Sequence, residues 1–371
     1  MLFHSDRKHS GSSFPSNSEV DCKLMRQVQA GGGMLRLRSQ LSLAFGVLVA
    51  IVPISPATAM PHIHRICRFD TFDDPSGAPR SMQSGIDEDA RALLNRARQA
   101  LQENQLGEAE AQARAFLTKA PASWEGHFLL GLILFRQGHA AESLAEYTEG
   151  AKHHDPEAGD LKIVALNYAL LNDYADADHW LTKSVTWNPM DAEAWYYLGR
   201  AKYQENRFEE AIAAFQKCLA IENRHVKAKA NLGLSLAGLG RTVQAEALYR
   251  EAIAWQADLN VKVAEPYIDL GDLLLDQNRT EDAMLALTQA QDIAPEEPRV
   301  PELLGKALVR QNKFAEARIQ LEKAVKLTPG SAADHYLLGQ VYRKLGMSDK
   351  AKSELDVAAT LSNSHSNSPP Q

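Results

Sequence analysis

The sequence has few cysteines and none of the common catalytic motifs. Its cysteines, Cys22, Cys67 and Cys218, show neither metal-ligand spacing nor a disulfide framework. It contains no Gly-rich phosphate loop in its helical part, no Gly-x-Ser-x-Gly nucleophile motif and no His-Glu-x-x-His zinc motif. These absences argue against catalysis. We therefore expect a protein that is not an enzyme and that uses no cofactor and no metal.

Two groups of histidines are candidate metal ligands and are therefore considered as alternatives. His62 and His64 lie close to Cys67 in the sequence, and the three could bind a metal weakly. His153 and His154 are neighbours at the end of an expected helix, where adjacent side chains point in different directions. The second pair is therefore interpreted as surface residues.

Positive charge is also in short supply. The formal net charge is −7, and the first 59 residues carry a surplus of basic side chains, so the remainder is more acidic still. Phosphate binding needs a basic face, which argues against nucleic acid as a partner. Hydrophobic residues make up 45% of the chain, which is typical of a folded protein. Val and Ile runs are short outside one N-terminal segment, and an all-α fold is expected.

The sequence contains one long apolar run. Leu41–Ile54 is a stretch of 14 residues without a charge, and Arg36 and Arg38 precede it. Ala57-Thr58-Ala59 then supplies small residues before a cut. These features predict a secretory signal peptide over residues 34–59 and a periplasmic or secreted protein. The run is short for a membrane span of about 20 residues. An uncleaved signal that anchors the chain in the inner membrane is the alternative.

The remaining boundaries follow from composition. Residues 1–33 are a polar leader, which is either disordered or the product of a mis-called start. Residues 60–89 contain helix breakers and little periodicity, which indicates a linker. Residues 90–365 form a repeat array. The tail is polar from Ser362 and ends in Pro-Pro-Gln, and disorder is expected over residues 366–371.

A period of about 34 residues runs through the array. A Leu-Gly pair recurs, a small residue follows the Gly by twelve positions, and a large residue stands four positions later, as at Gly199, Ala211 and Phe215. The fifth unit alone carries four extra residues, near Gln256–Val263. The units start at Ala90, Trp124, Ala158, Ala192, Val226, Ala264, Pro298 and Ala332.

The spacing within a unit has a physical reason. Apolar residues recur at three and four positions in each half, which is helical, and Gly or Asn stands between the halves, as at Gly138 and Asn206. Gly199 and its equivalents allow the two helices to approach closely, and Phe215 and its equivalents fill the space towards the next pair. One pair cannot bury its apolar faces alone, so each pair needs its neighbours.

These residues closely resemble the tetratricopeptide repeat family over residues 90–365. The resemblance implies a right-handed α-solenoid of about eight helix-turn-helix repeats. It also implies a protein-protein interaction scaffold that holds a peptide or protein in the concave groove lined by the first helix of each pair. Some members hold a C-terminal carboxylate with Lys and Asn. Here Lys162 is suitably placed, but Leu166 replaces the Asn, which argues against that mode.

The positions that the resemblance assigns to the groove change character along the chain. They are aromatic and apolar early and charged late, as at Asp272, Lys306, Arg310, Arg343 and Lys344. Exposed apolar and aromatic groups are typical of interaction sites. The alternative is that the same residues pack between helices. The predicted peptide-binding residues are Phe128, Leu132, Phe135, Tyr196, Arg200 and Tyr203.

Two other functions stay open at this point. The array could be the accessory subunit of an envelope enzyme complex, such as a glycosyltransferase, or a structural protein that assembles with its own copies. The partner, a protein or peptide, is not identified by the sequence. A membrane contact is expected only through an uncleaved signal segment.

Overall fold

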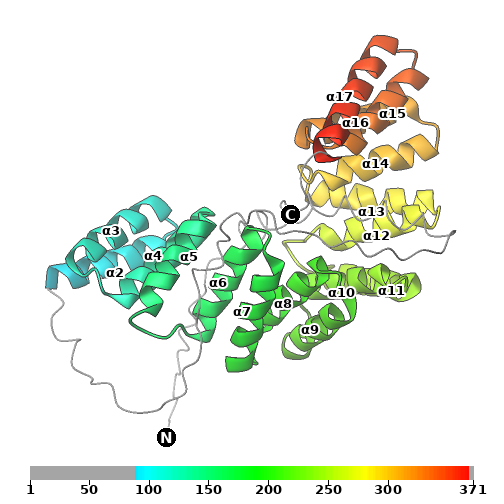
Figure 1. Ribbon diagram of the computed structural model, residues 1–371. Coiled ribbons are helices and arrows are strands. Elements are labelled where there is room, and N and C mark those ends of the chain that lie inside the picture. Colours follow the sequence, from blue (N-terminus) through cyan, green and yellow to red (C-terminus); the bar gives the residue numbers. More distant parts are fainter. Residues whose placement is uncertain (1–87, 367–371) are drawn as a thin grey trace, which may run out of the picture. The chain divides into compact units, whose positions relative to one another are not determined.

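The computed structural model describes residues 88–366, and the described chain consists of sixteen helices without a strand (Figure 1). The predicted signal segment and most of the linker lie outside the described residues. The helices are α2 (Glu88–Gln102), α3 (Leu106–Lys119), α4 (Trp124–Gln137), α5 (Ala140–Ala151), α6 (Ala158–Leu170), α7 (Tyr174–Trp187), α8 (Ala192–Gln204), α9 (Phe208–Ile221), α10 (Val226–Gly238), α11 (Thr242–Trp255), α12 (Glu265–Asp276), α13 (Thr280–Ile293), α14 (Arg299–Arg310), α15 (Phe314–Leu327), α16 (Ala332–Lys344) and α17 (Ser348–Ser366).

The helices form eight antiparallel pairs, and the first helix of each pair begins at or near a predicted start of a unit. The prediction of an all-α solenoid of about eight helix-turn-helix repeats is confirmed. The first described helix, α2, begins at Glu88, and the last, α17, continues through Ser366. Glu88 and Asp89 lie in the first turn of α2, where negative charge complements the helix dipole.

The turn inside each pair uses one residue with left-handed backbone geometry. Asn206 between α8 and α9 has φ 59°, and Gly138 between α4 and α5 has φ 83°. Glycine adopts this conformation without a steric cost, and Asn adopts it more readily than other residues with a side chain. The Gly and Asn residues that the sequence places between the halves therefore end the first helix and reverse the chain.

The recurring Leu-Gly pair is explained by the contact between the two helices of a pair. A Cβ atom on Gly199 would lie 2.6 Å from Cε1 of Phe215, and one on Gly131 would lie 2.8 Å from Cδ2 of Tyr147. Phe215 is fully buried. The glycine is therefore required because the large residue of the second helix lies directly against its backbone.

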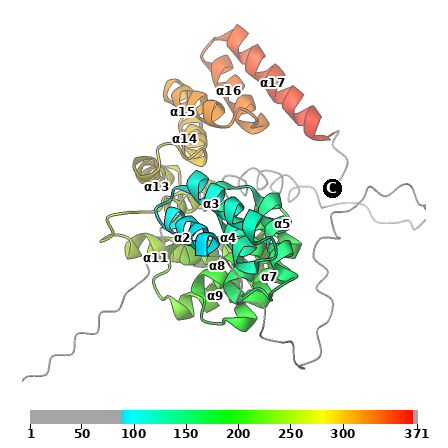
Figure 2. The ribbon, with the colours of Figure 1, turned by 90° about the vertical axis from the view of Figure 1, so that its left-hand side faces the viewer.

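The described chain divides into two units, which are considered separately. The first ends at Pro189 and contains α2–α7, and the second begins at Met190 and contains α8–α17. In the first unit, Leu130 and Ile133 of α4 are fully buried with residues of α2 and α3. In the second unit, one core cluster joins α11 to α14. Its last pairs, α14 with α15 and α16 with α17, stack in sequence order (Figure 2).

The four extra residues of the fifth unit form a loop between α11 and α12. The side chain of Gln256, which is almost fully buried, closes this loop. Its Nε2 donates to the carbonyl oxygen of Val263 at 3.1 Å, and its Oε1 accepts from the Val263 amide at 2.8 Å. The insertion is thus accommodated in the connection, and the helices on either side keep the register of the array.

Candidate binding surface on the first helices

The first helices carry the predicted groove positions on one side, and we call these sides together the first-helix face, whose accessibility differs from helix to helix. The pattern is clear in α16, where Tyr336, Gln340 and Lys344 are four residues apart and share one side of the helix. Tyr336 and Lys344 are exposed and Gln340 is partly exposed, whereas Leu338 and Val341 point into the core. The first-helix face corresponds to the groove positions of the sequence analysis.

In the first unit, Phe128 of α4 lies in the packing between α4 and α5. Its side chain is 7% exposed, and its ring stacks on Tyr147 of α5 with 5.4 Å between the centroids. A Cβ atom on Gly150 of α5 would lie 2.5 Å from the Phe128 ring, so this glycine makes the space that the ring fills. Phe128 therefore has the contacts of a packing residue.

The two other predicted residues of α4 differ from each other. Phe135 is buried, whereas Leu132 is partly exposed and packs against the core of α2–α4 with part of its side chain. Arg136 follows on the same side and donates from Nη1 to the carbonyl oxygen of Leu101 at 3.4 Å. Leu132 and Arg136 are therefore the accessible part of this face in α4.

In the second unit, the three predicted residues of α8 lie together but are only partly accessible. Tyr196 is 2% exposed, and Arg200, which is 6% exposed, lies over the Tyr196 ring at 5.8 Å from its centroid. The Tyr196 ring also lies 5.0 Å from that of His225, at the start of α10. Tyr203 is partly exposed and contacts Phe208 with 5.3 Å between ring centroids.

The structure therefore places the six predicted residues as two trios, one on α4 and one on α8, in separate units. Their role in peptide binding stays a prediction. The contacts of Phe128, Phe135 and Tyr196 are those expected of packing residues, which was the alternative raised by their spacing. A test of binding at these three positions would also disturb the fold.

Further along the second unit, charged side chains on the first helices pair with one another. Nη1 of Arg299 in α14 lies 2.9 Å from Oδ1 of Asp269, and its Nη2 lies 3.4 Å from Oδ2 of Asp272, both in α12. Burial alone would lower the pKa of Arg299, but the two carboxylates outweigh it and raise the pKa above its usual value. The guanidinium is therefore held in its charged form, and both aspartates are occupied.

The cations beyond Arg299 are less fully neutralised. Lys306 pairs with Glu302 of the same helix, and Arg310 donates to the carbonyl oxygen of Leu275. Arg343 and Lys344 are exposed and form no ion pair within residues 88–366. The first-helix face of α14 and α16 therefore carries positive charge that remains available to a partner.

Asp269 was not among the residues predicted for the site. It stands two residues before Gly271, at a position that holds Leu129, Tyr197, Leu303 and Leu337 in other units, and such a position is normally assigned to packing. An aspartate at a position that is apolar in most other units, with Asn231 as a polar exception, indicates a buried charge that needs a partner. Arg299 is that partner, and it is 30 residues away, not 34, so the repeat period alone does not reveal the pair.

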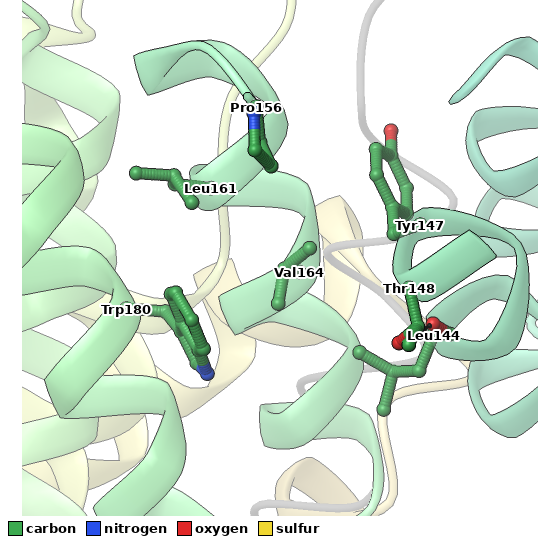
Figure 3. A pocket seen from close by; sticks show the side chains of 7 residues that line it. All are labelled: Leu144, Tyr147, Thr148, Pro156, Leu161, Val164 and Trp180. Carbon is green, nitrogen blue, oxygen red and sulfur yellow. Dashed lines mark hydrogen bonds between the residues drawn. The ribbon is translucent and has the colours of Figure 1, made fainter. Parts of the chain in front are cut away.

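A small internal cavity lies in the first unit. A cavity of about 10 Å³ lies between α5, α6 and α7, with Trp180 and Leu161 on one side and Tyr147 on the other (Figure 3). A void of this volume holds about one water molecule. The helices in residues 88–366 include none that is both long and apolar enough to span a membrane, and no cluster of metal-ligating side chains occurs there. The candidate His62, His64 and Cys67 lie outside this range.

Five family models of the tetratricopeptide repeat match the chain, and together they cover most of the array. The matches to models described as "Tetratricopeptide repeat" or "TPR repeat" fall on residues 88–158, 192–225, 226–296, 305–346 and 335–365.

The chain is also similar to parts of two curated proteins. It is 24% identical over 193 residues to "Essential for maintenance of the cell wall protein 1" of Saccharomyces cerevisiae, which covers 51% of this chain and 19% of that protein. It is 31% identical over 97 residues to the "Peroxisomal targeting signal receptor" of Kluyveromyces lactis, which covers 26% of this chain and 17% of that protein. The chain thus spans less than a fifth of the length of each relative.

Solved structures share the fold at low identity. A tetratricopeptide repeat protein from Parabacteroides merdae superposes with a TM-score of 0.59 and 21% identity over 69% of this chain and 99% of the other. The structure of the APC/C hetero-tetramer Cut9-Hcn1 gives 0.56 and 17% over 74% and 52%. Yeast Tom70 gives 0.55 and 17% over 77% and 63%. These likenesses concern the fold.

Proposed function

This chain belongs to the tetratricopeptide repeat family, and we propose that it is a non-catalytic scaffold that binds a protein or peptide on its first-helix face. The observation that carries the proposal is that first helices of both units keep accessible side chains on this face. Tyr336 on α16 is 52% exposed, and Leu132 on α4 is partly exposed. Aromatic and apolar side chains that remain in water are typical of interaction surfaces.

Repeat architecture supports the same role. Each pair contacts mainly its neighbours, so side chains on the uncovered side of a helix contribute little to the fold and are free to differ between units. Their change from apolar groups on α4 to cations on α14 and α16 occurs although all three helices carry the Leu-Gly pair. One relative is by name a receptor for a targeting signal, which agrees with a binding role.

The experiment is a capture of partners by the immobilised full-length chain. We would compare it with a variant that carries Leu132→Ser and Tyr336→Ala, one change on the first-helix face of each unit. The matched control carries Leu285→Ser and Ile319→Ser, which replace exposed apolar residues on the second helices α13 and α15 (70% and 58% exposed). All three proteins should melt at similar temperatures, since the four positions are partly or largely accessible.

A partner that is lost only from the first variant supports the proposal. A partner lost only from the control lies on the second helices, and the proposed face is then wrong. Capture of nothing but further copies of the chain would favour the self-assembling alternative over a scaffold for other proteins. An enzyme among the captured proteins, retained by the control and lost from the first variant, would make the chain an accessory subunit.

We further propose that the chain is exported across a membrane and acts in the periplasm or outside the cell. The support is the basic start at Arg36 and Arg38, the apolar run Leu41–Ile54 and the small residues before Met60. Intact-mass measurement of the full-length product expressed with its own N-terminus tests this proposal. A mature chain that begins at Met60 supports cleavage, an uncut chain in the membrane fraction supports an anchor, and an uncut chain in the cytosolic fraction contradicts export.

A further inference from the structure

We infer that the first-helix face of α14 and α16 binds an extended peptide segment rich in Asp and Glu. This inference rests on the proposed function and names the chemistry of the partner. It starts from the repeat register. Residues 34 apart occupy equivalent positions, so Lys306 corresponds to Gln340 and Arg310 to Lys344, and the two helices contact each other.

The cations of this surface, which we call the cationic strip, are Lys306 and Arg310 on α14 and Arg343 and Lys344 on α16. Arg310, Arg343 and Lys344 lie in the last turn of their helices, and Lys306 lies one turn before Arg310. Arg310, Arg343 and Lys344 are exposed and Lys306 is partly exposed. The cationic strip is therefore accessible to a ligand along both helices.

The acidic groups near the cationic strip do not balance it. Glu302 pairs with Lys306, and Asp276 of α12 occupies the position that corresponds to Arg310. Asp269 and Asp272 are paired with Arg299 and contribute no free negative charge. Positive charge thus remains at Arg343 and Lys344 in a chain whose formal net charge is −7. This local reversal of sign favours an acidic partner.

The geometry suits an extended peptide. Packed helices lie roughly 8–10 Å apart, and about three residues of extended chain span that distance. Carboxylates three or four residues apart in a peptide can therefore reach Arg310 on α14 and Lys344 on α16 in turn. Guanidinium groups bind carboxylates with two parallel hydrogen bonds, and the exposed ring of Tyr336 offers a flat surface for the peptide backbone.

A nucleic acid fits this surface less well than a peptide. Binding a phosphate backbone depends on many cations along an extended path, and its strength comes from counterion release. The cationic strip has four cations on two helices, and the flanking helices α12 and α13 present the exposed carboxylates of Asp276 and Glu281. These carboxylates would repel the continuing phosphates of a polynucleotide.

The test is fluorescence anisotropy with the full-length chain and a fluorescein-labelled peptide of alternating Glu and Ser. The comparison peptide replaces every Glu by Gln. We expect the Glu peptide to bind at least about tenfold more tightly than the Gln peptide at low salt, and to weaken as salt screens the charges. Arg343→Ala with Lys344→Ala should weaken binding of the Glu peptide by about tenfold. Lys326→Ala with Lys352→Ala removes two exposed cations from α15 and α17 and should change it by less than about twofold.

Equal binding of the two peptides, or an equal loss in the two variants, would overturn the inference. Tighter binding of a single-stranded RNA oligonucleotide of the same charge would overturn it too. The proposed function fails independently of this test: it fails when the variant with Leu132→Ser and Tyr336→Ala still captures every partner. A partner that depends on the first-helix face while the Glu peptide does not bind would leave the function standing and refute only the acidic chemistry.

Discussion

His335 of α16 is held between two hydrogen-bond acceptors, and the nearer is Glu354 of α17. Nδ1 of His335 lies 2.6 Å from Oε2 of Glu354, and its Nε2 lies 3.0 Å from the carbonyl oxygen of Pro329. The second repeat contains the same arrangement: His127 lies 2.7 Å from Glu146 and 2.9 Å from the carbonyl oxygen of Pro121. The contact joins the first helix, the second helix and the preceding turn.

We expect removal of the carboxylate at Glu354 to destabilise the last repeat. Both ring nitrogens of His335 lie within hydrogen-bond distance of an oxygen atom, so the carboxylate of Glu354 is one of the two partners of this largely buried ring. Glu354→Ala leaves a largely buried ring nitrogen without its acceptor and should lower the free energy of unfolding by about 1–3 kcal/mol. Urea unfolding followed by circular dichroism measures the change. Asp356→Ala on the same helix is the control, because Asp356 is exposed, and an equal loss there would refute the argument.

A methyl group added at a glycine should lower the free energy of unfolding only where a side chain of the partner helix lies close to that glycine. Gly199→Ala places a Cβ atom 2.6 Å from the fully buried ring of Phe215, which has no room to move away. We expect a loss of about 1–3 kcal/mol in the free energy of unfolding. Gly159→Ala at the start of α6 meets no atom within 4 Å and should be neutral or stabilise by up to about 1 kcal/mol. Thermal unfolding of the two variants tests this contrast, and a similar loss in both would contradict it.

The architecture could be predicted from the sequence because its determinants are local and repeated. The Leu-Gly pair, the small residue and the large residue describe a contact within one unit, as between Gly199 and Phe215, and the array repeats that contact. The positions of the turns could be predicted for the same reason, since Asn206 and Gly138 adopt a backbone conformation that few other residues tolerate. The four extra residues after Gln256 were also visible as a break in the period.

The accessibility of the candidate site could not be predicted in the same way. Phe128 and Leu132 both belong to the groove pattern, but Phe128 is buried because Gly150 of α5 leaves space for its ring. That space depends on Gly150, which lies on another helix, so the periodicity of α4 alone does not indicate it. The pairing of Asp269 with Arg299 is similar, because it joins residues at different positions of successive units. Comparing residues one repeat length apart does not reveal contacts between non-equivalent positions.

The left-handed backbone conformation of Asn206 predicts the order of stability of variants at this position. Its φ of 59° costs a residue with a Cβ atom about 1–2 kcal/mol, of which Asn recovers part through local hydrogen bonds. Asn206→Gly should therefore be neutral or slightly stabilising, and Asn206→Ala should lower the free energy of unfolding by about 1 kcal/mol. Comparing both variants with the parent by thermal unfolding would test the order. A more stable Ala variant than Gly variant would contradict the proposed role of the turn.

Cys218 should resist alkylation until the array unfolds. Its side chain is fully buried, and burial, with smaller contributions from Glu222 and Asp191, raises the pKa of its thiol to about 12. The native protein therefore keeps the unreactive thiol form well above neutral pH, whereas the thiol of an unfolded chain ionises near its ordinary pKa of 9.0. Because the pKa is raised in the folded state, this group favours the fold below pH of about 9 and loses that contribution as the pH rises further.

The measurement uses a variant with Cys22→Ser and Cys67→Ser, in which Cys218 is the only remaining thiol of the three. Iodoacetamide labelling followed by intact mass should be slow in buffer and fast in urea, with the change at the same urea concentration as the loss of helical signal. Labelling that is rapid in buffer at neutral pH would show that α9 opens locally, and would refute close packing of Cys218. Labelling could also be slow in buffer but become fast at a urea concentration below that at which the helical signal is lost. Because repeat arrays can lose individual helix pairs before the whole array unfolds, this result would place the weakest contact of the second unit around α9.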